Sequence, residues 1–172
     1  TKKYYFEEND NMELNDDDIL KELGIVKYPE IIEFCGNMRC NVKGKCIEFS
    51  DVTFGSYTNS ETILNMKEIE LIDVDKIIWI ENKANYIDYI SKKNKNEFVI
   101  YHGGFYSPIK GEFFKKIYQA SKKVKKEVVY LHWSDIDIGG FKIFNRLKNN
   151  IVEEVEPYKM DKNTLLENKD YW

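Results

Sequence analysis

The second half of the chain alternates three times between a short apolar run and a longer amphipathic stretch. The apolar runs are "KIIWI" from residue 76, "EFVIY" from residue 97 and "VVYLHW" from residue 128. They are rich in β-branched and aromatic residues, which favours buried strands, and a segment with helical periodicity follows each. Successive strand and helix units predict a parallel sheet covered by helices on both faces. "VEPYKM" predicts a fourth strand, and "DKNTLLEN" predicts the start of a last helix.

The first half of the chain has a different pattern. Residues 1–18 are polar and acidic with little periodicity, which predicts a frayed lead-in. "DDDILKELGI" predicts one short helix that the aspartates cap and Gly24 ends. Between residues 28 and 71, β-rich runs such as "EIIEFCG", "CIEFSD" and "EIELID" are separated by "NVKGKC" and "SYTNSE", which predicts hairpins or a meander.

The fold class predicted from these patterns is α/β. We expect a polar lead-in at residues 1–18, a helix plus a small β-rich appendage at residues 19–74, and the α/β domain at residues 75–172. A length of 172 residues suits one such domain with an addition. The chain has neither an apolar segment long enough to span a bilayer nor a signal-peptide pattern, so we expect a soluble cytoplasmic protein. Three cysteines without a CxxC pair favour reduced thiols in a small sheet over a metal site.

The charge of the chain is unevenly distributed. The net charge is −4, so no overall basic character indicates a nucleic-acid partner. Residues 91–126, however, carry ten lysines and two glutamates, whereas the acidic residues gather near both ends of the chain. Such a lysine-rich stretch is compatible with a solvated helix face or with a surface that attracts phosphate.

Polar residues stand where the expected strands end. Glu81 follows the first apolar run, His102 with Gly103 and Gly104 follows the second, and Asp135 and Asp137 follow the third. The carboxyl ends of parallel strands meet at one edge of a sheet, where ligands gather. We therefore expect these side chains at a single edge.

Three carboxylates at one edge repel one another unless a cation lies between them. Oxygen ligands from a few carboxylates, completed by water or phosphate, suit Mg²⁺. Gly140 opens the following helix without a Cβ, which allows backbone or phosphate to approach its N-terminus. Acidic residues at strand ends also cap helices, so a structural role for Asp135 and Asp137, and for Glu81, stays open.

"ENKANY", "YHGG" and "LHWSDIDIGGFKIFNRLK" together resemble a Toprim domain, a Rossmann-like fold of topoisomerases and primases with a glutamate after one strand and a DxD after a later one. The chain is more closely similar to the C-terminal domain of the JetD family, the nuclease subunits of Wadjet anti-plasmid systems. The family features fall on Glu81 and Asn82, on the glycine pair after the second strand, on residues 133–140, and on Met160 with Asp161. One departure is Ser134, which stands where the family has glycine.

The resemblance implies a metal-dependent DNA endonuclease with a Toprim sheet of about four parallel strands. It assigns Asp135 and Asp137 to holding Mg²⁺ or Mn²⁺, with Glu81 as a further ligand or as the general acid/base, and no protein nucleophile. Asn82 and Asp161 are two further candidate members of this site. Candidate contacts to phosphate or DNA are these residues: His102, Gly103, Gly104, Gly140, Lys110 and Lys115.

The partners implied are double-stranded DNA and the SMC-like and kleisin-like subunits of Wadjet, with no membrane. Cutting both strands of a duplex needs two sites, which suits a homodimer. Such nucleases carry an upstream DNA-binding region, so we expect weak or no activity from this domain alone.

Three other interpretations compete with a nuclease. A DxD phosphatase would place its DxD on the first strand of the sheet, and here two strand and helix units precede it. A glycosyltransferase could use DxD to hold a nucleotide sugar, but would leave Glu81 without a role. The third is a Toprim-like module that binds DNA or an SMC-type partner without catalysis, and only cleavage would separate it from a nuclease.

Overall fold

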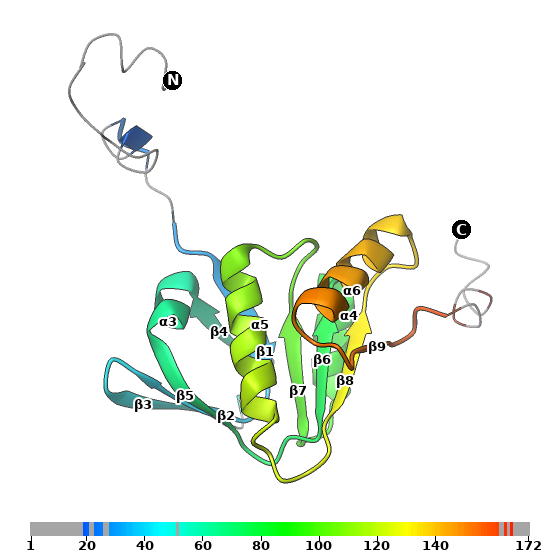
Figure 1. Cartoon of the computed structure of the whole chain (residues 1–172), viewed down its shortest axis with the longest axis horizontal. Helices are drawn as coiled ribbons and strands as arrows, with labels where there is room; N and C mark the ends of the chain where they lie inside the picture. Colours follow the sequence, from blue (N-terminus) through cyan, green and yellow to red (C-terminus); the bar gives the residue numbers. More distant parts are fainter. Residues whose placement is uncertain are drawn as a thin grey trace.

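The structure is a computed structural model that describes residues 19–20, 23–25, 28–50, 52–161, 164 and 166 (Figure 1). Its main sheet has six strands in the order β4-β1-β7-β6-β8-β9. Four of them are parallel, with these bounds: β6 (Lys76–Ile80), β7 (Glu97–Tyr101), β8 (Val129–Trp133) and β9 (Glu156–Pro157). The predicted α/β class with a parallel sheet of four strands is confirmed.

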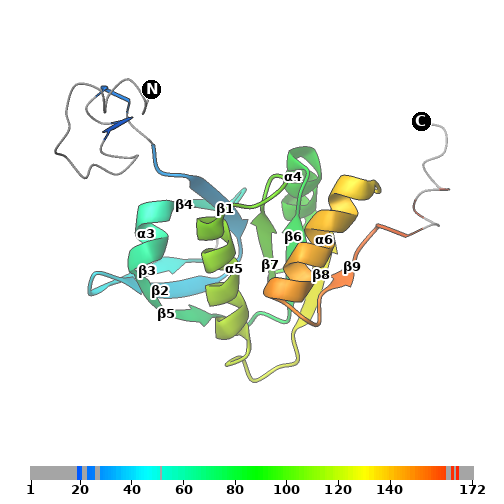
Figure 2. The ribbon, with the colours of Figure 1, turned by 45° about the horizontal axis from the view of Figure 1, so that its top comes forward.

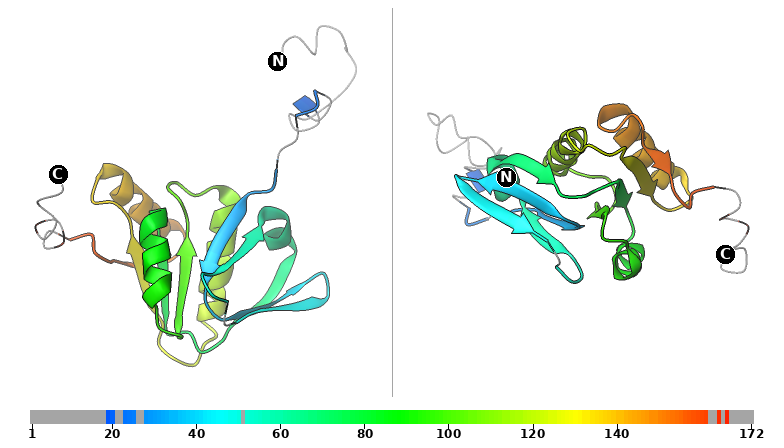
Figure 3. Two further views of the ribbon diagram at one scale, coloured as in Figure 1. Left: turned by 180° about the vertical axis from the view of Figure 1, so that it is seen from behind. Right: turned by 90° about the horizontal axis from the view of Figure 1, so that it is seen from below.

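Helices cover both faces of this sheet. α4 (Lys83–Lys92) lies on one face, and α5 (Pro108–Ser121) and α6 (Ile138–Asn150) lie on the other (Figures 1 and 3). The strand β6 shows why, because all its residues after the first are buried with alternating directions. Ile77 and Trp79 join the core under α5 and α6, whereas Ile78 and Ile80 pack with Tyr86 and Ile90 of α4.

Two further strands extend the main sheet in the antiparallel sense. β1 (Ile31–Cys35) pairs with β7, and β4 (Ser56–Asn59) pairs with the outer edge of β1. Both come from the segment predicted as a separate appendage, so the division at residues 74 and 75 is not a division between sheets. "SYTNSE" was expected to be a break, and that expectation was wrong: it forms β4 and the start of α3 (Ser60–Asn65), whose first turn Asn59 caps through Thr62 N–H at 2.9 Å.

A second sheet of three strands accounts for the rest of the β-rich segment. Its order is β3-β2-β5, formed by β3 (Lys45–Phe49), β2 (Met38–Val42) and β5 (Met66–Leu71). The predicted hairpin at "NVKGKC" is confirmed. Lys43 and Gly44 both have positive φ, 50° and 81°, as the tight turns that join twisted strands require. Figure 2 shows this sheet beside α3 and α5.

The helix expected after each of the three strands is confirmed, as α4, α5 and α6. The lead-in at residues 1–18 and most of the two terminal helices predicted at residues 16–25 and 161–168 lie outside the described residues. No helix in the described part of the chain is both long and apolar enough to cross a membrane.

Gly36 lies at the junction between the two sheets, where the chain leaves β1 for β2. Its φ is +155°, and a Cβ placed there would lie 2.5 Å from Phe98 Cδ2 and 2.9 Å from Phe98 Cα. The second contact is with backbone, so rotation of a side chain could not relieve it. The junction therefore depends on glycine.

We expect Gly36→Ala to lower the free energy of unfolding by about 2–3 kcal/mol, because the added methyl overpacks a buried junction. Gly44→Ala is the matched control: its φ is also positive, but nothing lies within 4 Å of the added Cβ. It should cost only about 1 kcal/mol. Urea unfolding followed by circular dichroism measures both, and equal losses would contradict the crowding argument.

Candidate functional site

The carboxyl ends of β6, β7 and β8 meet at one edge of the main sheet. The ladder continues past the strands, because Glu81 N–H donates to Trp133 O at 2.9 Å and His102 N–H donates to Ile80 O at 3.0 Å. Glu81, His102 and the turn after Trp133 are thus held in register by backbone hydrogen bonds. The structure brings together the three strand ends that the sequence predicts to be neighbours.

Glu81 is half-buried at this edge, and its Oε2 has no hydrogen-bond partner in the described part of the chain. Burial raises the pKa of its carboxyl group, and the negative charges of Asp135 and Asp137 raise that pKa further, whereas a hydrogen bond from the backbone of Asp135 lowers it. The three carboxylates therefore interact electrostatically. A raised pKa makes the Glu81 carboxylate a stronger base than an ordinary glutamate.

Both aspartates are exposed on the turn between β8 and α6. Asp137 is also the N-cap of α6, because its Oδ1 accepts a hydrogen bond from Gly140 N–H at 2.7 Å. Its carboxylate additionally lies at the positive end of the helix dipole, which stabilises the negative charge. Asp137 thus has a structural role irrespective of any ligand, whereas no hydrogen bond of the Asp135 side chain is found among the described residues.

The start of α6 approaches the aspartate turn most closely at Gly140. A Cβ on Gly140 would lie 2.1 Å from the backbone oxygen of Asp135 and 2.8 Å from Ser134 Oγ. Glycine is therefore required so that the start of α6 can pack against the turn that bears both aspartates.

Ser134, the residue that departs from the JetD pattern, is only 2% exposed. Its N–H and its hydroxyl both face Met160 Sδ at 3.5 Å. The Ser134 hydroxyl thus lies under the turn and not at the sheet edge. It therefore does not obstruct a phosphate that approaches the two aspartates. The same contact places Met160 and Asp161, which follow β9, beside the aspartate turn.

The carboxylate oxygens at the edge are of the ligand type that a divalent cation such as Mg²⁺ prefers. Among the described residues, however, no three His, Cys, Asp or Glu side chains are gathered closely enough to enclose a metal ion. Mg²⁺ usually keeps several waters and takes one or two carboxylates plus substrate phosphate, so it does not need an enclosed cage. The unpaired Glu81 Oε2 and the exposed carboxylate of Asp135 are the donors that would be available to it.

The two further candidates have capping roles. Asn82 is the N-cap of α4, and its Oδ1 accepts from Ala84 N–H at 2.9 Å and Asn85 N–H at 3.3 Å. Asp161 Oδ1 accepts from the backbone N–H of Thr164 at 2.8 Å and from its hydroxyl at 3.2 Å. These hydrogen bonds give both side chains a structural role that needs no ligand.

The glycine-rich turn after β7 has a left-handed backbone, with φ of +62° at Gly103 and +79° at Gly104. Lys110, in the first turn of α5, reaches back to this turn and donates from Nζ to His102 O at 3.1 Å. Lys110 therefore lies at the carboxyl edge of the sheet, and its ammonium group already donates one hydrogen bond. Lys115 is exposed one turn further along α5.

His102 and His132 form a buried stack, which the sequence did not predict. Their ring centroids are 5.1 Å apart with planes 18° from parallel, and Phe144 of α6 packs on His132 at 5.7 Å. His102 Nδ1 contacts Gly104 O at 3.0 Å, but its Nε2 and both nitrogens of His132 have no partner in the described region. His102 is 1% exposed, so its ring as placed does not face a ligand.

Burial accounts for the protonation state of this pair. It lowers the pKa of His102 to about 4, with a smaller contribution of the same sign from Lys110. It lowers the pKa of His132 to about 3, and the neighbouring His102 acts in the same direction. Both rings are therefore neutral at physiological pH.

Comparison with known proteins places this geometry in a family. A family model described as "Wadjet protein JetD, C-terminal" matches residues 42–172. The chain is also 34% identical over 149 residues to Wadjet protein JetD of Bacillus cereus (strain Q1), an alignment that covers 86% of this chain. The chain belongs to the JetD C-terminal family.

The alignment covers 35% of the length of the B. cereus JetD, so the chain corresponds to about a third of that relative. The family match includes all three strand ends and all candidate site residues from Glu81 to Asp161. The resemblance inferred from the motifs is therefore confirmed at the level of the family.

Acidification should destabilise the domain through the stacked histidines. Their pKa values are lower in the folded protein than the ordinary value near 6.5, so the unfolded chain binds more protons as the pH falls. The contribution of the two histidines to stability should be complete above about pH 6.5. Between about pH 6.5 and about pH 4, the free energy of unfolding should fall by roughly 1.4 kcal/mol per pH unit for each histidine. Urea unfolding at a series of pH values measures the slope.

His132→Phe removes one titrating ring while keeping an aromatic side chain, and it should reduce the slope between pH 6 and pH 4.5 by about half. His132→Phe with the same slope as the parent would show that other groups cause the acid sensitivity.

The aspartate turn should not tolerate a side chain at Gly140. Gly140→Ala should lower the free energy of unfolding by about 3 kcal/mol or displace α6, because the methyl would overlap the Asp135 carbonyl. Gly139→Ala is the control, since its added Cβ would meet only the side chain of Asp137, 3.1 Å away. It should change stability by less than about 1 kcal/mol. Thermal melts of the two variants compare them directly, and a neutral Gly140→Ala would contradict the close approach.

Proposed function

We propose that this chain is the DNA-hydrolysing domain of a JetD-type, divalent-metal-dependent endonuclease of a Wadjet system. The observation that carries the proposal is the edge at which Glu81, half-buried with an unpaired oxygen and a raised pKa, lies within electrostatic reach of Asp135 and Asp137. Burying a carboxylate beside two others costs free energy, and a bound cation would offset that cost. Membership in the JetD family supports the same conclusion.

Asp135 and Asp137 would hold Mg²⁺ or Mn²⁺ through oxygens that face solvent, with Glu81 as a further ligand. The bound ion would polarise the scissile phosphate and lower the barrier to attack by water. Glu81 is the residue suited to move a proton, because its burial and its acidic neighbours raise its pKa. Asp137 would orient its carboxylate through the hydrogen bond to Gly140 N–H, which fixes the rotamer before any ligand arrives.

The partners proposed are double-stranded DNA and the other Wadjet subunits, SMC-like and kleisin-like, with DNA cleavage in the cytoplasm. The B. cereus relative bears the Wadjet name, which supports association with such subunits. A homodimer would supply the two sites that cutting both strands requires. Lys110, Lys115 and the glycine pair 103–104 are the proposed contacts to phosphate along the edge.

A non-catalytic Toprim-like module is the second candidate. Asp137, Asn82 and Asp161 all cap helical turns, and no enclosed metal cluster lies among the described residues. On this alternative the carboxylates organise the turn after β8, and the domain binds DNA or a partner without cutting.

Cleavage of closed circular plasmid in Mg²⁺ or Mn²⁺ separates the two candidates. The substrate should be tested with this chain alone and with a chimera in which the chain replaces the aligned region of B. cereus JetD, since the chain covers 35% of that relative. We expect nicked or linear product from the chimera, weaker product from the chain alone, and loss of at least a hundredfold in rate for Asp135→Ala and Glu81→Gln. Gel separation of plasmid forms measures the rates.

Asp137→Asn is the most informative variant, because the amide oxygen can still cap α6 while the charge is removed. It should lose cleavage while its free energy of unfolding stays within about 1 kcal/mol of the parent, the size of the lost interaction with the helix dipole. Glu153→Gln, an exposed acid outside the site, is the matched control and should leave the rate unchanged. Full cleavage by Asp137→Asn, or no cleavage by a chimera that still binds DNA, would favour the non-catalytic module.

A further inference from the structure

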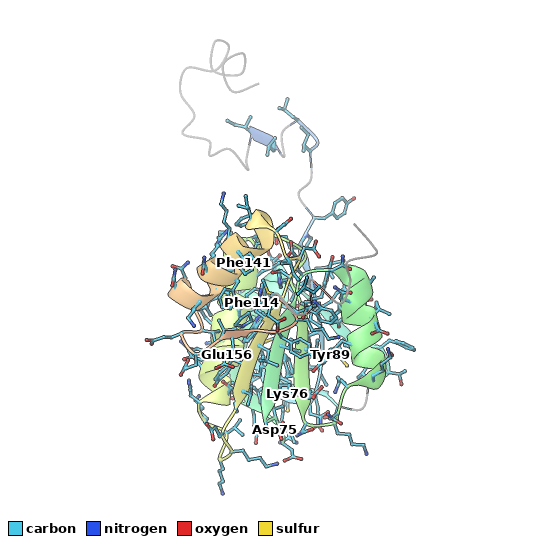
Figure 4. The ribbon with its side chains drawn as sticks, turned by 90° about the vertical axis from the view of Figure 1, so that its right-hand side faces the viewer. Asp75, Lys76, Tyr89, Phe114, Phe141 and Glu156 are labelled. Atoms are coloured by element: carbon cyan, nitrogen blue, oxygen red, sulfur yellow. The ribbon has the colours of Figure 1, made fainter. Side chains whose placement is uncertain are left out.

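A hollow of about 350 Å³ lies on the α4 face of the main sheet, beside the end of β8. It is formed by α4 and the turn that follows it, the starts of β6 and β7, the last residue of β8 and the residues after β9. Figure 4 labels two of its lining residues, Tyr89 on α4 and Lys76 at the start of β6. We call it the Trp133 hollow.

Three half-buried aromatic side chains line the Trp133 hollow. Tyr158 lies edge to face with Tyr89, with ring centroids 6.2 Å apart and an angle of 88°, and with Trp133, at 5.7 Å and 81°. This packing fixes the rings, and their partial exposure leaves ring surface accessible. Aromatic surface of this kind is the platform on which nucleic-acid bases stack.

Four lysines and two acids surround the rings. Lys76 is committed to Glu97, whose side chain is buried, at 2.6 Å. Lys92 pairs with Asp88 at 2.6 Å, but these side chains are 71% and 60% exposed, so the pair contributes little and can exchange for another anion. The hollow therefore has a local excess of positive charge, although the whole chain carries −4.

The positive charge of Lys159 lies over two of the aromatic rings. Its ammonium lies 4.4 Å from the centroid of the Trp133 ring and 5.5 Å from that of Tyr158, a cation–π arrangement on an exposed residue. An arriving base could take the place of the ammonium over the ring while the ammonium turns to the phosphate. Lysines together with accessible aromatic faces are the combination that binds single strands without sequence preference.

Trp133 connects the hollow to the candidate site along the chain. Trp133 is the last residue of β8, its carbonyl accepts the N–H of Glu81, and the chain runs from it directly into the aspartate turn. A strand held over Trp133 would thus pass the carboxylate edge within a few residues of Asp135.

From these observations we propose that the Trp133 hollow binds an unpaired nucleic-acid strand, with bases on Trp133 and Tyr158 and phosphates on Lys92 and Lys159. Bases inside a duplex are already stacked, so only an unpaired strand could use the ring faces. The biological meaning rests on the proposed DNA-directed function, since such a strand would come from DNA handled at the neighbouring edge. Binding itself requires neither metal nor cleavage.

The test is a fluorescence anisotropy titration of labelled (dT)20 with this chain in EDTA, beside a duplex of the same length. Lys92→Glu/Lys159→Glu should weaken binding of (dT)20 at least tenfold. Lys123→Glu/Lys125→Glu makes the same change in charge on the α5 side of the sheet, at two exposed positions without ion pairs among the described residues. It should weaken binding of (dT)20 less than threefold. Equal losses in the two double variants would overturn the proposal, as would tighter binding of the duplex.

Intrinsic tryptophan fluorescence provides a readout that leaves the hollow unmutated. In a Trp172→Phe background the remaining tryptophans are Trp133 and the fully buried Trp79, so contact quenching by (dT)20 reports on Trp133. We expect saturable quenching with the same dissociation constant as the anisotropy signal. No quenching despite binding would place the strand elsewhere and overturn the proposal.

The two proposals fail separately. Cleavage of plasmid with equal (dT)20 losses in the two double variants would overturn the hollow and keep the nuclease. Binding of (dT)20 at the hollow without cleavage by the chimera would keep the hollow and overturn the nuclease.

Discussion

The register of three parallel strands is the constraint on which the rest of the structure depends. β6 pairs with β7 and with β8 over its whole length, and two backbone hydrogen bonds extend the pairing one residue further, from Glu81 N–H to Trp133 O and from His102 N–H to Ile80 O. The carboxyl end of β6 is therefore fixed between its neighbours by main-chain contacts. Side chains at this edge need no long-range contacts of their own to be brought together, because the ladder has already positioned them.

In the turn after β8, the same residues shape the backbone and are candidates for the site. Asp137 caps α6, Gly140 permits the close approach of α6 to the Asp135 carbonyl, and Ser134 is buried against Met160. A sequence that only had to start a helix could do so with one capping residue. The second acid, Asp135, has no such capping role among the described residues, and the unpaired oxygen of Glu81 adds a cost that helix capping does not explain. That difference supports the proposal that the edge binds a ligand.

The sequence predicted what depends on local patterns. The apolar runs at β6, β7 and β8 and the glycine turn at Lys43 and Gly44 are readable because strand alternation and turn chemistry are properties of neighbouring residues. The pairing of β1 with β7 was missed, since short strands do not encode which sheet they join. The stack of His102 on His132 was missed for the same reason: the two residues lie on strands separated by β6, and neither is marked by its neighbours in the sequence. The edge at which the three strands end was foreseeable, and helix capping by an aspartate was one of the open alternatives. Only the structure shows which aspartate caps α6 and that Ser134 is buried.

Alternation along β8 separates three environments over a few residues. Tyr130 and His132 face the core under α5 and α6, whereas Leu131 and Trp133 face the α4 side, and the aspartates follow beyond the strand. A polyanion is repelled by uncompensated carboxylates and attracted by lysines, and at physiological ionic strength both effects fall off within about 8 Å. On the proposed function, an encounter with DNA at the acidic edge would depend on basic groups on adjoining surfaces, of which Lys159 over Trp133 is one. A slip of β8 by one residue against β6 would turn Trp133 into the core and His132 outward. The register that fixes the carboxylate edge thus also determines that the face beside it is aromatic and basic.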